Sequence, residues 1–356
     1  MTDRNNQIIL NSLYSANRGF PINPNGKEIC GIKPKNNDTY FEYDFQKAKD
    51  FLNSIDVTSE LYFNEPYNHK RNFIFRGHSN SKYPLIPTIF RNISKNEYNI
   101  YKNKQYPKRE LDLFADFSKG INDLGFHIEN DSLALANYYG FSGSKKSEEG
   151  FGFFDRPSDL MRKFPTSEQT RILGLAQHFG VPTRLLDFTY NPYKAIFFST
   201  KNILHNRKVD ETKKIGLWII PELLIEAVKR IKFIDKIEVK KFDNKNIIAQ
   251  EGIFINYFPP QEKDNFPIFK FENEDKECFQ VKTLDKYIVE NNDATFQQII
   301  TEITGKPMLF TLPHSEVDLI AEKLDHLNIN WITMMPNLEG AKNEAIRRMK
   351  LNTFSF

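Results

Sequence analysis

Cysteines are scarce in this sequence, long hydrophobic runs are missing and the net charge is small, and each of these features excludes a class of protein. The 356 residues include two cysteines, Cys30 and Cys278, too widely separated along the chain for a disulfide framework or a zinc knuckle. No run of about 18 apolar residues occurs, so we expect neither a membrane span nor a membrane partner. The first residues also lack the basic and apolar regions of a secretory signal. We therefore expect a cytoplasmic protein.

Several well-known catalytic motifs are also missing. The sequence has no HExxH, Walker A, GxGxxG, CxxC or GxSxG pattern, so zinc hydrolysis, P-loop phosphoryl transfer and Rossmann binding lack their signals. We predict no metal site. The net charge of +3 indicates no general attraction to nucleic acid or membranes, although a local basic face remains compatible with it.

The residues that are present favour a globular α+β protein. Forty per cent are hydrophobic, including 32 Phe and 15 Tyr, which is enough for a sizeable core. Strand and helix patterns follow one another irregularly, and we expect a mixed central sheet with helices. Strands are predicted at 73–75, 216–220, 237–242, 251–258 and 308–313, and helices at 45–55, 108–126, 166–180, 193–204, 221–231 and 315–329. Residues 1–45, rich in Asn, Pro and Gly, read as an irregular N-terminal arm, and residues 142–153 as a surface loop.

The segment 173–200 is the most informative part of the chain. Arg184 and Asp187 lie in an otherwise apolar run, where an unpaired charge costs several kcal/mol. These two residues either contact a ligand, pair with each other or cap the helix that starts after Asn191. His178 ends the preceding helix, whose carbonyl terminus favours a cation.

Two further positions carry binding chemistry. The strand at 73–75 delivers Arg76 and Gly77 to its end, where guanidinium can fork onto phosphate oxygens and glycine lets a ligand approach the main chain. The alternative for Arg76 is a salt bridge with a carboxylate. Gln250 and Glu251 stand at the start of the strand predicted at 251–258, where Glu251 is either a reacting acid or a solvated residue.

Five segments together resemble the FRG-domain family, which is named for its Phe-Arg-Gly motif. They are FRG at 75–77, YPLIPTIFR at 83–91, LGLAQHFGVPTRLLDFTYNPYKAIFF at 173–198, IIAQEGIF at 247–254 and NINWITMMPNLEG at 328–340. The resemblance implies one FRG domain over residues 46–356, with a helical insertion at about 95–165. Such domains occur in bacterial and phage proteins, often in settings that suggest conflict between cell and virus.

A weaker resemblance links the Arg-Gly strand end to the first motif of ADP-ribosyltransferases. It implies an ADP-ribosyltransferase-like core with NAD as cofactor, in which Arg76 holds the pyrophosphate and Gly77 meets the nicotinamide amide. Gln250 or Glu251 would address the ribose and stabilise the positive sugar formed as nicotinamide leaves. The usual Gln-x-Glu spacing would place the acid at Gly252, and this departure favours a noncatalytic site. His178, Arg184 and Asp187 complete the predicted cofactor-binding set.

The leading prediction is therefore an NAD-dependent ADP-ribosyltransferase-like effector of a defence or toxin system. Its acceptor would be nucleic acid or protein, and a neutralising partner protein is expected. The alternative is a noncatalytic recognition module that senses a nucleotide, a phage component or a partner protein. A nucleic-acid-binding or nuclease-like protein is less favoured because no acidic metal-binding cluster is evident. The aromatic and basic segment 98–109 could contact single strands, although such a run is usually a solvated surface.

Overall fold

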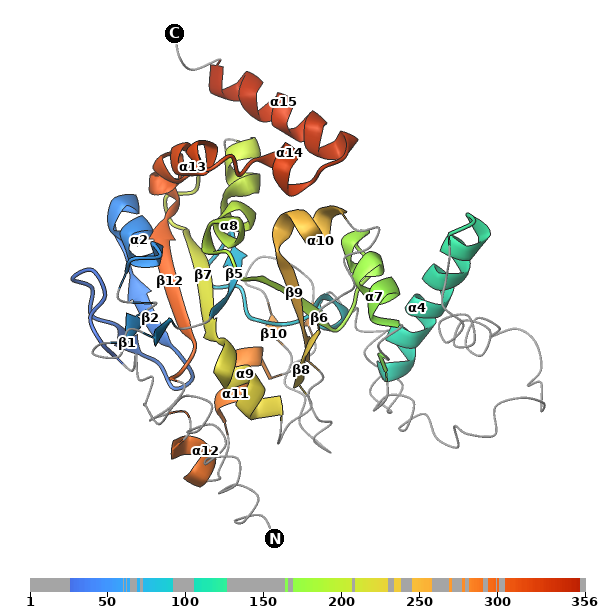
Figure 1. Ribbon diagram of the computed structural model, residues 1–356, viewed down its shortest axis with the longest axis horizontal. Helices are drawn as coiled ribbons and strands as arrows, with labels where there is room; N and C mark the ends of the chain where they lie inside the picture. Colours follow the sequence, from blue (N-terminus) through green and yellow to red (C-terminus); the bar gives the residue numbers. More distant parts are fainter. Residues whose placement is uncertain are drawn as a thin grey trace.

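The computed structural model describes most of the chain (Figure 1). The described residues are 26–59, 61, 63–64, 69–70, 73–91, 106–126, 164–165, 169–206, 209–229, 234–237, 245–257, 269–270, 277–278, 282–290, 294–298, 300 and 305–352. Within them, every helix is too short or too polar to span a bilayer.

A mixed eight-stranded sheet forms the centre of the described structure. Its strand order is β1-β2-β12-β7-β5-β6-β9-β8. The strands are β1 (Lys35–Asn36), β2 (Phe41–Asp44), β5 (Phe73–His78), β6 (Leu185–Thr189), β7 (Lys214–Pro221), β8 (Ile234–Ile237), β9 (Gly252–Tyr257) and β12 (Met308–Pro313). The β2–β12 pair is parallel and the other neighbouring pairs are antiparallel. The predicted α+β class with a mixed sheet is confirmed.

Helices cover both faces of this sheet and one of its ends. Figure 1 shows α8 beside the central strands, with α13, α14 and α15 above it and α4 and α7 beyond the β6–β9 end. The helices are α2 (Ala48–Ile55), α4 (Tyr106–Asp123), α7 (Gln169–His178), α8 (Pro192–Asn206), α9 (Glu222–Lys229), α10 (Lys245–Gln250), α11 (Leu284–Val289), α12 (Ala294–Gln298), α13 (Val317–His326), α14 (Trp331–Met334) and α15 (Leu338–Asn352). Two 3-10 turns, η1 (Thr88–Phe90) and η3 (His314–Glu316), and the two-stranded ribbons β3 (Phe63–Asn64) with β4 (His69–Lys70) and β10 (Phe269–Lys270) with β11 (Glu277–Cys278) complete the described elements.

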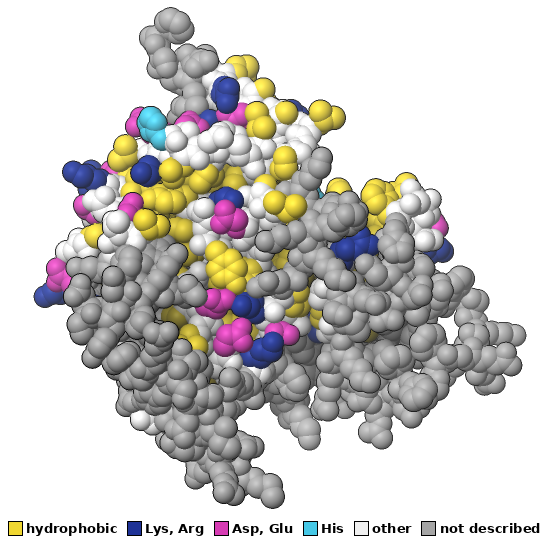
Figure 2. All heavy atoms as spheres, in the orientation of Figure 1, with side chains coloured by type: hydrophobic (Ala, Val, Ile, Leu, Met, Phe, Trp, Pro, Cys, Tyr) yellow, Lys and Arg dark blue, Asp and Glu magenta, His cyan; other side chains and the backbone are white. Residues whose placement is uncertain are grey.

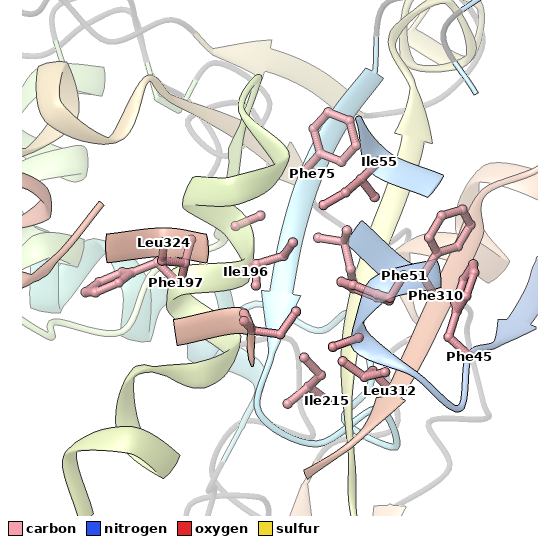
Figure 3. Packing of buried hydrophobic residues seen from close by; sticks show 14 of the residues in the cluster. Phe45, Phe51, Ile55, Phe75, Ile196, Phe197, Ile215, Phe310, Leu312 and Leu324 are labelled. Carbon is pink, nitrogen blue, oxygen red and sulfur yellow. The ribbon is translucent and has the colours of Figure 1, made fainter. Parts of the chain in front are cut away.

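The central strands bury side chains on both faces because successive residues of a strand point to opposite sides. On β7, Ile219 packs into the cluster under α2, α8 and α13, whereas Trp218 and Ile220 pack into the cluster with α9 and α11. Figure 3 shows part of the first cluster, with Ile196 of α8 and Phe310 of β12 among its members. The sheet is therefore the shared wall of two cores.

Several sequence predictions differ from the structure. The strand predicted at 73–75 is longer, because β5 continues to His78 through its pairing with β7, so Arg76 and Gly77 lie inside the strand and not at its end. The predicted N-terminal arm is not irregular throughout, because β1 and β2 join the sheet and Tyr43 is fully buried. The strand predicted at 237–242 shares only Ile237 with the observed strand β8, which ends there. Residues 238–244 lie outside the described part of the chain. The strand predicted from Glu251 begins one residue later and follows α10, a helix of six residues that is too short to show a helical period. Most of the predicted insertion at 95–165 and the loop at 142–153 also lie outside the described residues, whereas the helix expected at 108–126 is α4.

Gly77 lets helix α8 approach strand β5 closely. A Cβ atom built at Gly77 would overlap the carbonyl oxygen of Ala195 and lie 3.0 Å from the backbone nitrogen of Ser199. Both neighbours are backbone atoms, so they cannot move aside without shifting the helix. Close packing of helix and strand therefore accounts for this glycine without reference to a ligand.

We expect Gly77→Ala to lower the free energy of unfolding by about 1–3 kcal/mol, because an added methyl group overpacks the interface. Urea denaturation measures the change. Gly120→Ala is the matched control, since a Cβ there meets nothing within 4 Å and the substitution should stabilise helix α4 by up to about 1 kcal/mol. Equal effects of the two substitutions would contradict the packing argument.

A buried ion pair attaches helix α4 to the turn before β6. Glu110 and Arg184 are each 1% exposed, and the Arg184 Nε donates to Glu110 Oε2 over 2.6 Å. The backbone N–H of Arg184 also donates to Glu110 Oε1 at 2.8 Å. The guanidinium lies 5.0 Å from the ring centroid of Phe164. Each charge is thus satisfied by the other in a dry environment.

Glu110→Ala should destabilise the protein by about 3–5 kcal/mol, because it leaves the Arg184 charge buried without its carboxylate. The double variant Glu110→Leu with Arg184→Met should recover much of this loss, since it removes both charges and keeps apolar volume. Lys213→Ala, which breaks an exposed pair with Asp210, should have a much smaller effect than Glu110→Ala, because solvent screens that pair. Thermal and urea unfolding compare all three, and a double variant no more stable than Glu110→Ala would overturn this account.

Candidate functional site

A pocket opens where strands β5 and β6 part. In the described residues these strands are paired at one position, Phe75 with Thr189, whereas β5 pairs with β7 along its full length. The pocket has a volume of about 330 Å³, toward the small end of the range for small-molecule sites. Its walls come from β5, β6, β9, α7, α8 and α10. Five of the predicted site residues line it: Arg76, Gly77, His178, Asp187 and Gln250.

Arg76 spans the gap between the two strands. Its Nη1 donates to the Asp187 backbone carbonyl at 2.6 Å and lies 3.6 Å from the Asp187 carboxylate, and its Nε donates to His78 Nε2 at 3.1 Å. Its side chain is 15% exposed. Burial lowers the pKa of Arg76, and the neighbouring Asp187 opposes this shift. No partner among the described residues occupies Nη2, so one edge of the guanidinium remains available to a ligand.

His78 fixes the orientation of Arg76. Its Nδ1 must carry the proton, because its partner at 3.1 Å is the carbonyl oxygen of Tyr83, and Nε2 is then the acceptor for Arg76. Burial, reinforced by the positive charges of Arg76 and Arg91, holds the pKa of His78 well below its ordinary value. The sequence analysis placed His78 only in a polar turn. Its position two residues after Arg76, on the same face of a strand, was the available signal.

Asp187 supplies a carboxylate at the pocket. Its Oδ1 accepts from Gln177 Nε2 at 2.5 Å, and the Gln177 oxygen accepts from the Thr183 hydroxyl. The Asp187 side chain is 60% exposed, so its second oxygen is accessible. Together with Arg76 and His78, these groups form a hydrogen-bonded chain across the gap between β5 and β6.

His178 is at the end of α7, as predicted, but its charge differs from the expectation. Its Nε2 accepts from the Asn246 side-chain amide at 2.8 Å. Burial lowers the pKa of His178, and the charges of Glu339 and Asp187 oppose the shift without reversing it. Desolvation therefore outweighs the attraction of the helix terminus for a cation, and His178 presents a neutral ring to the pocket.

Gln250 and Glu251 are adjacent in sequence but have different environments. Gln250 lines the pocket, and its Nε2 donates to the Met334 carbonyl at 3.2 Å. Among the described residues its Oε1 has no partner, so it can accept from a ligand hydroxyl. Glu251 has a positive φ of 49° and pairs with Lys194, whose Nζ lies 2.8 Å from its Oε1. Glu251 is absent from the pocket lining.

Arg184 lies outside the pocket. It pairs with Glu110, not with Asp187, so the predicted pairing within the turn is wrong, and Arg184 is not among the residues that line this pocket. The physical reason is the β alternation: Arg184 precedes β6 and turns into the core under α4, whereas Asp187 is the exposed residue of that strand. The prediction that Arg184 and Asp187 cap the helix after Asn191 is also wrong. Asn191 itself caps α8, because its side chain accepts from the N–H groups of Tyr193 and Lys194 at 3.0 and 3.3 Å.

Aromatic and basic side chains from α8 complete the pocket and were missed by the sequence analysis. Phe198 and Lys201, three positions apart on the helix, both line it. Helical spacing could have indicated this shared face, since residues three apart are neighbours on a helix surface. Within the described part of the chain, no three His, Cys, Asp or Glu side chains gather as metal ligands. The arrangement offers cations for an anionic ligand, a carboxylate for hydroxyls or a developing positive charge, and neutral rings for stacking.

The buried neutral state of His78 predicts a pH dependence of stability. Its folded pKa lies below the unfolded value of about 6.5, so the unfolded chain binds more protons and stability falls as pH drops through that value. We expect His78→Gln to remove up to about 1 kcal/mol of the loss between pH 7.5 and 5.5. Urea denaturation at both pH values checks this, with His178→Gln as the comparison variant. Identical pH profiles for wild type and His78→Gln would contradict the assignment.

Comparison with known proteins identifies the part of the chain that builds this pocket. The model of the FRG domain matches residues 71–208, which include β5, β6, α7 and α8. Arg76, Gly77, His178 and Asp187 fall inside the match, whereas Gln250 follows it. Searches of curated proteins and of solved structures give no significant match. Residues 71–208 therefore match the FRG domain, as the resemblance of the FRG and Gly-Val-Pro segments predicted.

Proposed function

We propose that the pocket binds NAD and that the protein is an NAD-dependent ADP-ribosyltransferase-like effector. The observation that supports this most directly is the guanidinium of Arg76, held by His78 and Asp187 at the gap between β5 and β6 with one edge available. A planar, pre-oriented guanidinium suits the oxygens of a pyrophosphate. The separation of β5 from β6 at this point also leaves the space in which a ligand can reach that guanidinium.

The proposed chemistry places a carboxylate beside a sugar that becomes positive. The bond between the ribose C1′ and the nicotinamide nitrogen breaks, and its electron pair leaves with nicotinamide. The acceptor nucleophile then bonds to C1′ and releases its proton. Asp187 supplies the stabilising carboxylate in this scheme, because Glu251 is neutralised by Lys194 away from the pocket. The free oxygen of Gln250 accepts a hydrogen bond from a ribose hydroxyl.

The acceptor and the biological setting rest on the family resemblance. Figure 2 shows Lys and Arg side chains close to Asp and Glu side chains on the described part of one face, without a separation by sign. Such a mixed surface does not favour nucleic acid over protein as acceptor. A defence or toxin role, with a neutralising partner, completes the proposal.

A noncatalytic recognition module is the second function that the geometry supports. The observation in its favour is the Lys194–Glu251 pair. This pair engages Glu251, the acidic residue that the resemblance to transferases assigns to the site. In that case the same pocket binds a nucleotide and signals its presence without breaking it. Binding would then occur with no release of nicotinamide.

Labelled NAD with cell extract tests the leading proposal. We expect transfer of label by the full chain and its loss in Arg76→Ala, because the pyrophosphate loses its guanidinium. Asp187→Asn should retain NAD binding, measured by calorimetry, but transfer label at least about a hundredfold more slowly, since a group that stabilises transition-state charge is removed. Arg348→Ala, at an exposed arginine on α15, is the control and should behave as wild type.

Each outcome of this experiment separates the two functions. NAD binding without label transfer or nicotinamide release favours the recognition module. Absence of binding at millimolar NAD would rule out NAD as the ligand for either function. Full transfer by Asp187→Asn would assign the carboxylate role elsewhere.

A further inference from the structure

Lys201 presents a cation to the pocket that no described residue neutralises by contact. Its Nζ lies 4.8 Å from the ring centroid of Phe198 and 5.3 Å from that of Trp331. Among the described residues it makes no hydrogen bond and no ion pair. Burial lowers the pKa of Lys201, and the more distant charges of Asp187 and Glu339 oppose this. The ammonium group is thus held by two rings with its donors unused.

Two other buried or partly buried cations among the described residues, Lys194 and Arg347, are satisfied by direct contacts. Lys194 donates to the Ala249 carbonyl and to Glu251, and Arg347 pairs with Asp325 and Glu344. An ammonium removed from water without such partners costs free energy that ring contacts offset only in part. Lys201 therefore lowers the stability of the folded chain, as is common where a side chain serves a ligand.

We propose that Lys201 and Arg76 form a two-cation site that selects a diphosphate over a monophosphate. Arg76 contacts one phosphate through its available edge, and the Lys201 ammonium donates to the other. This inference rests on the proposed function in taking the pocket as a nucleotide site, but it does not depend on any transfer reaction.

The charges of the pocket lining agree with this selection. Arg76 and Lys201 are positive, Asp187 is negative, and the lowered pKa of His178 leaves it neutral near pH 7. One positive charge remains in excess of the carboxylate. Arg76 is already engaged with Asp187, so a single phosphate can be held beside it, whereas a second phosphate needs the separate charge of Lys201.

Calorimetric binding of ADP, inorganic pyrophosphate and AMP to the full chain tests the proposal. Lys201→Gln should lower the affinity for ADP and for pyrophosphate by about tenfold to a hundredfold, the effect of losing a hydrogen bond to a charged group. AMP should be affected much less, and Lys201→Arg should retain most of the preference for ADP. Lys306→Gln is the matched control, because Lys306 also lies over a ring, 5.5 Å from the Phe41 centroid, but outside the pocket lining.

Stability of the ligand-free variants gives a second readout that a merely structural lysine would not show. Lys201→Gln should unfold at a urea concentration equal to or higher than that of wild type, because an unpaired, partly buried charge is removed. Lower stability together with unchanged ADP affinity would assign Lys201 to packing and overturn the proposal. Equal losses for ADP and AMP, or no binding of ADP and pyrophosphate to wild type, would overturn it as well.

The proposal and the proposed function fail in different ways. ADP selectivity that depends on Lys201, with no consumption of NAD, would support the two-cation site and count against the transferase. Consumption of NAD by wild type and Lys201→Gln alike, with equal ADP affinities, would count against the two-cation site alone.

Discussion

Strands β5 and β6 are paired at one position, and the site depends on the gap that this leaves in the sheet. A sheet that continued its ladder past Phe75 and Thr189 would place backbone hydrogen bonds where the pocket now lies. The gap is bridged by side chains instead, since Arg76 donates to the Asp187 carbonyl from one strand to the other. Because β5 is fully paired with β7 and packed on α8, the gap has a rigid edge that holds Arg76 in place.

The pairing of buried charges determines which of them can serve a ligand. Arg184 and Glu110 satisfy each other in a buried pair away from the pocket, and Lys194 pairs with the half-exposed Glu251 outside the pocket lining. Arg76 is oriented by a neutral histidine, which leaves part of its guanidinium available. Lys201 has ring contacts in place of a carboxylate. The same physics, the cost of dry charge, thus explains both the scaffold pairs and the groups offered to the pocket.

Much of the fold could be predicted because its signals are local. The short apolar runs of β12 and β7, the amphipathic spacing of α13 and the Asn191 cap of α8 each depend on residues a few positions apart. The short helix α10 was missed since six residues show no clear period, and Glu251 ends it in a left-handed conformation that is uncommon for glutamate. The contribution of β2 was missed because its four residues follow an Asn- and Pro-rich stretch.

The sequence alone determined a strand at Phe73–Phe75 leading into Arg76 and Gly77, the two helices flanking the Gly-Val-Pro turn, and the presence of charges in an apolar run, whereas the structure extends that strand to His78. Only the tertiary structure decided the partners of those charges. Arg184 meets Glu110 across 74 positions, and Lys194 meets Glu251 across 57. Such contacts follow from the packing of whole elements, which periodicity and capping do not encode, because Coulomb attraction acts on distance in space and not on separation along the chain.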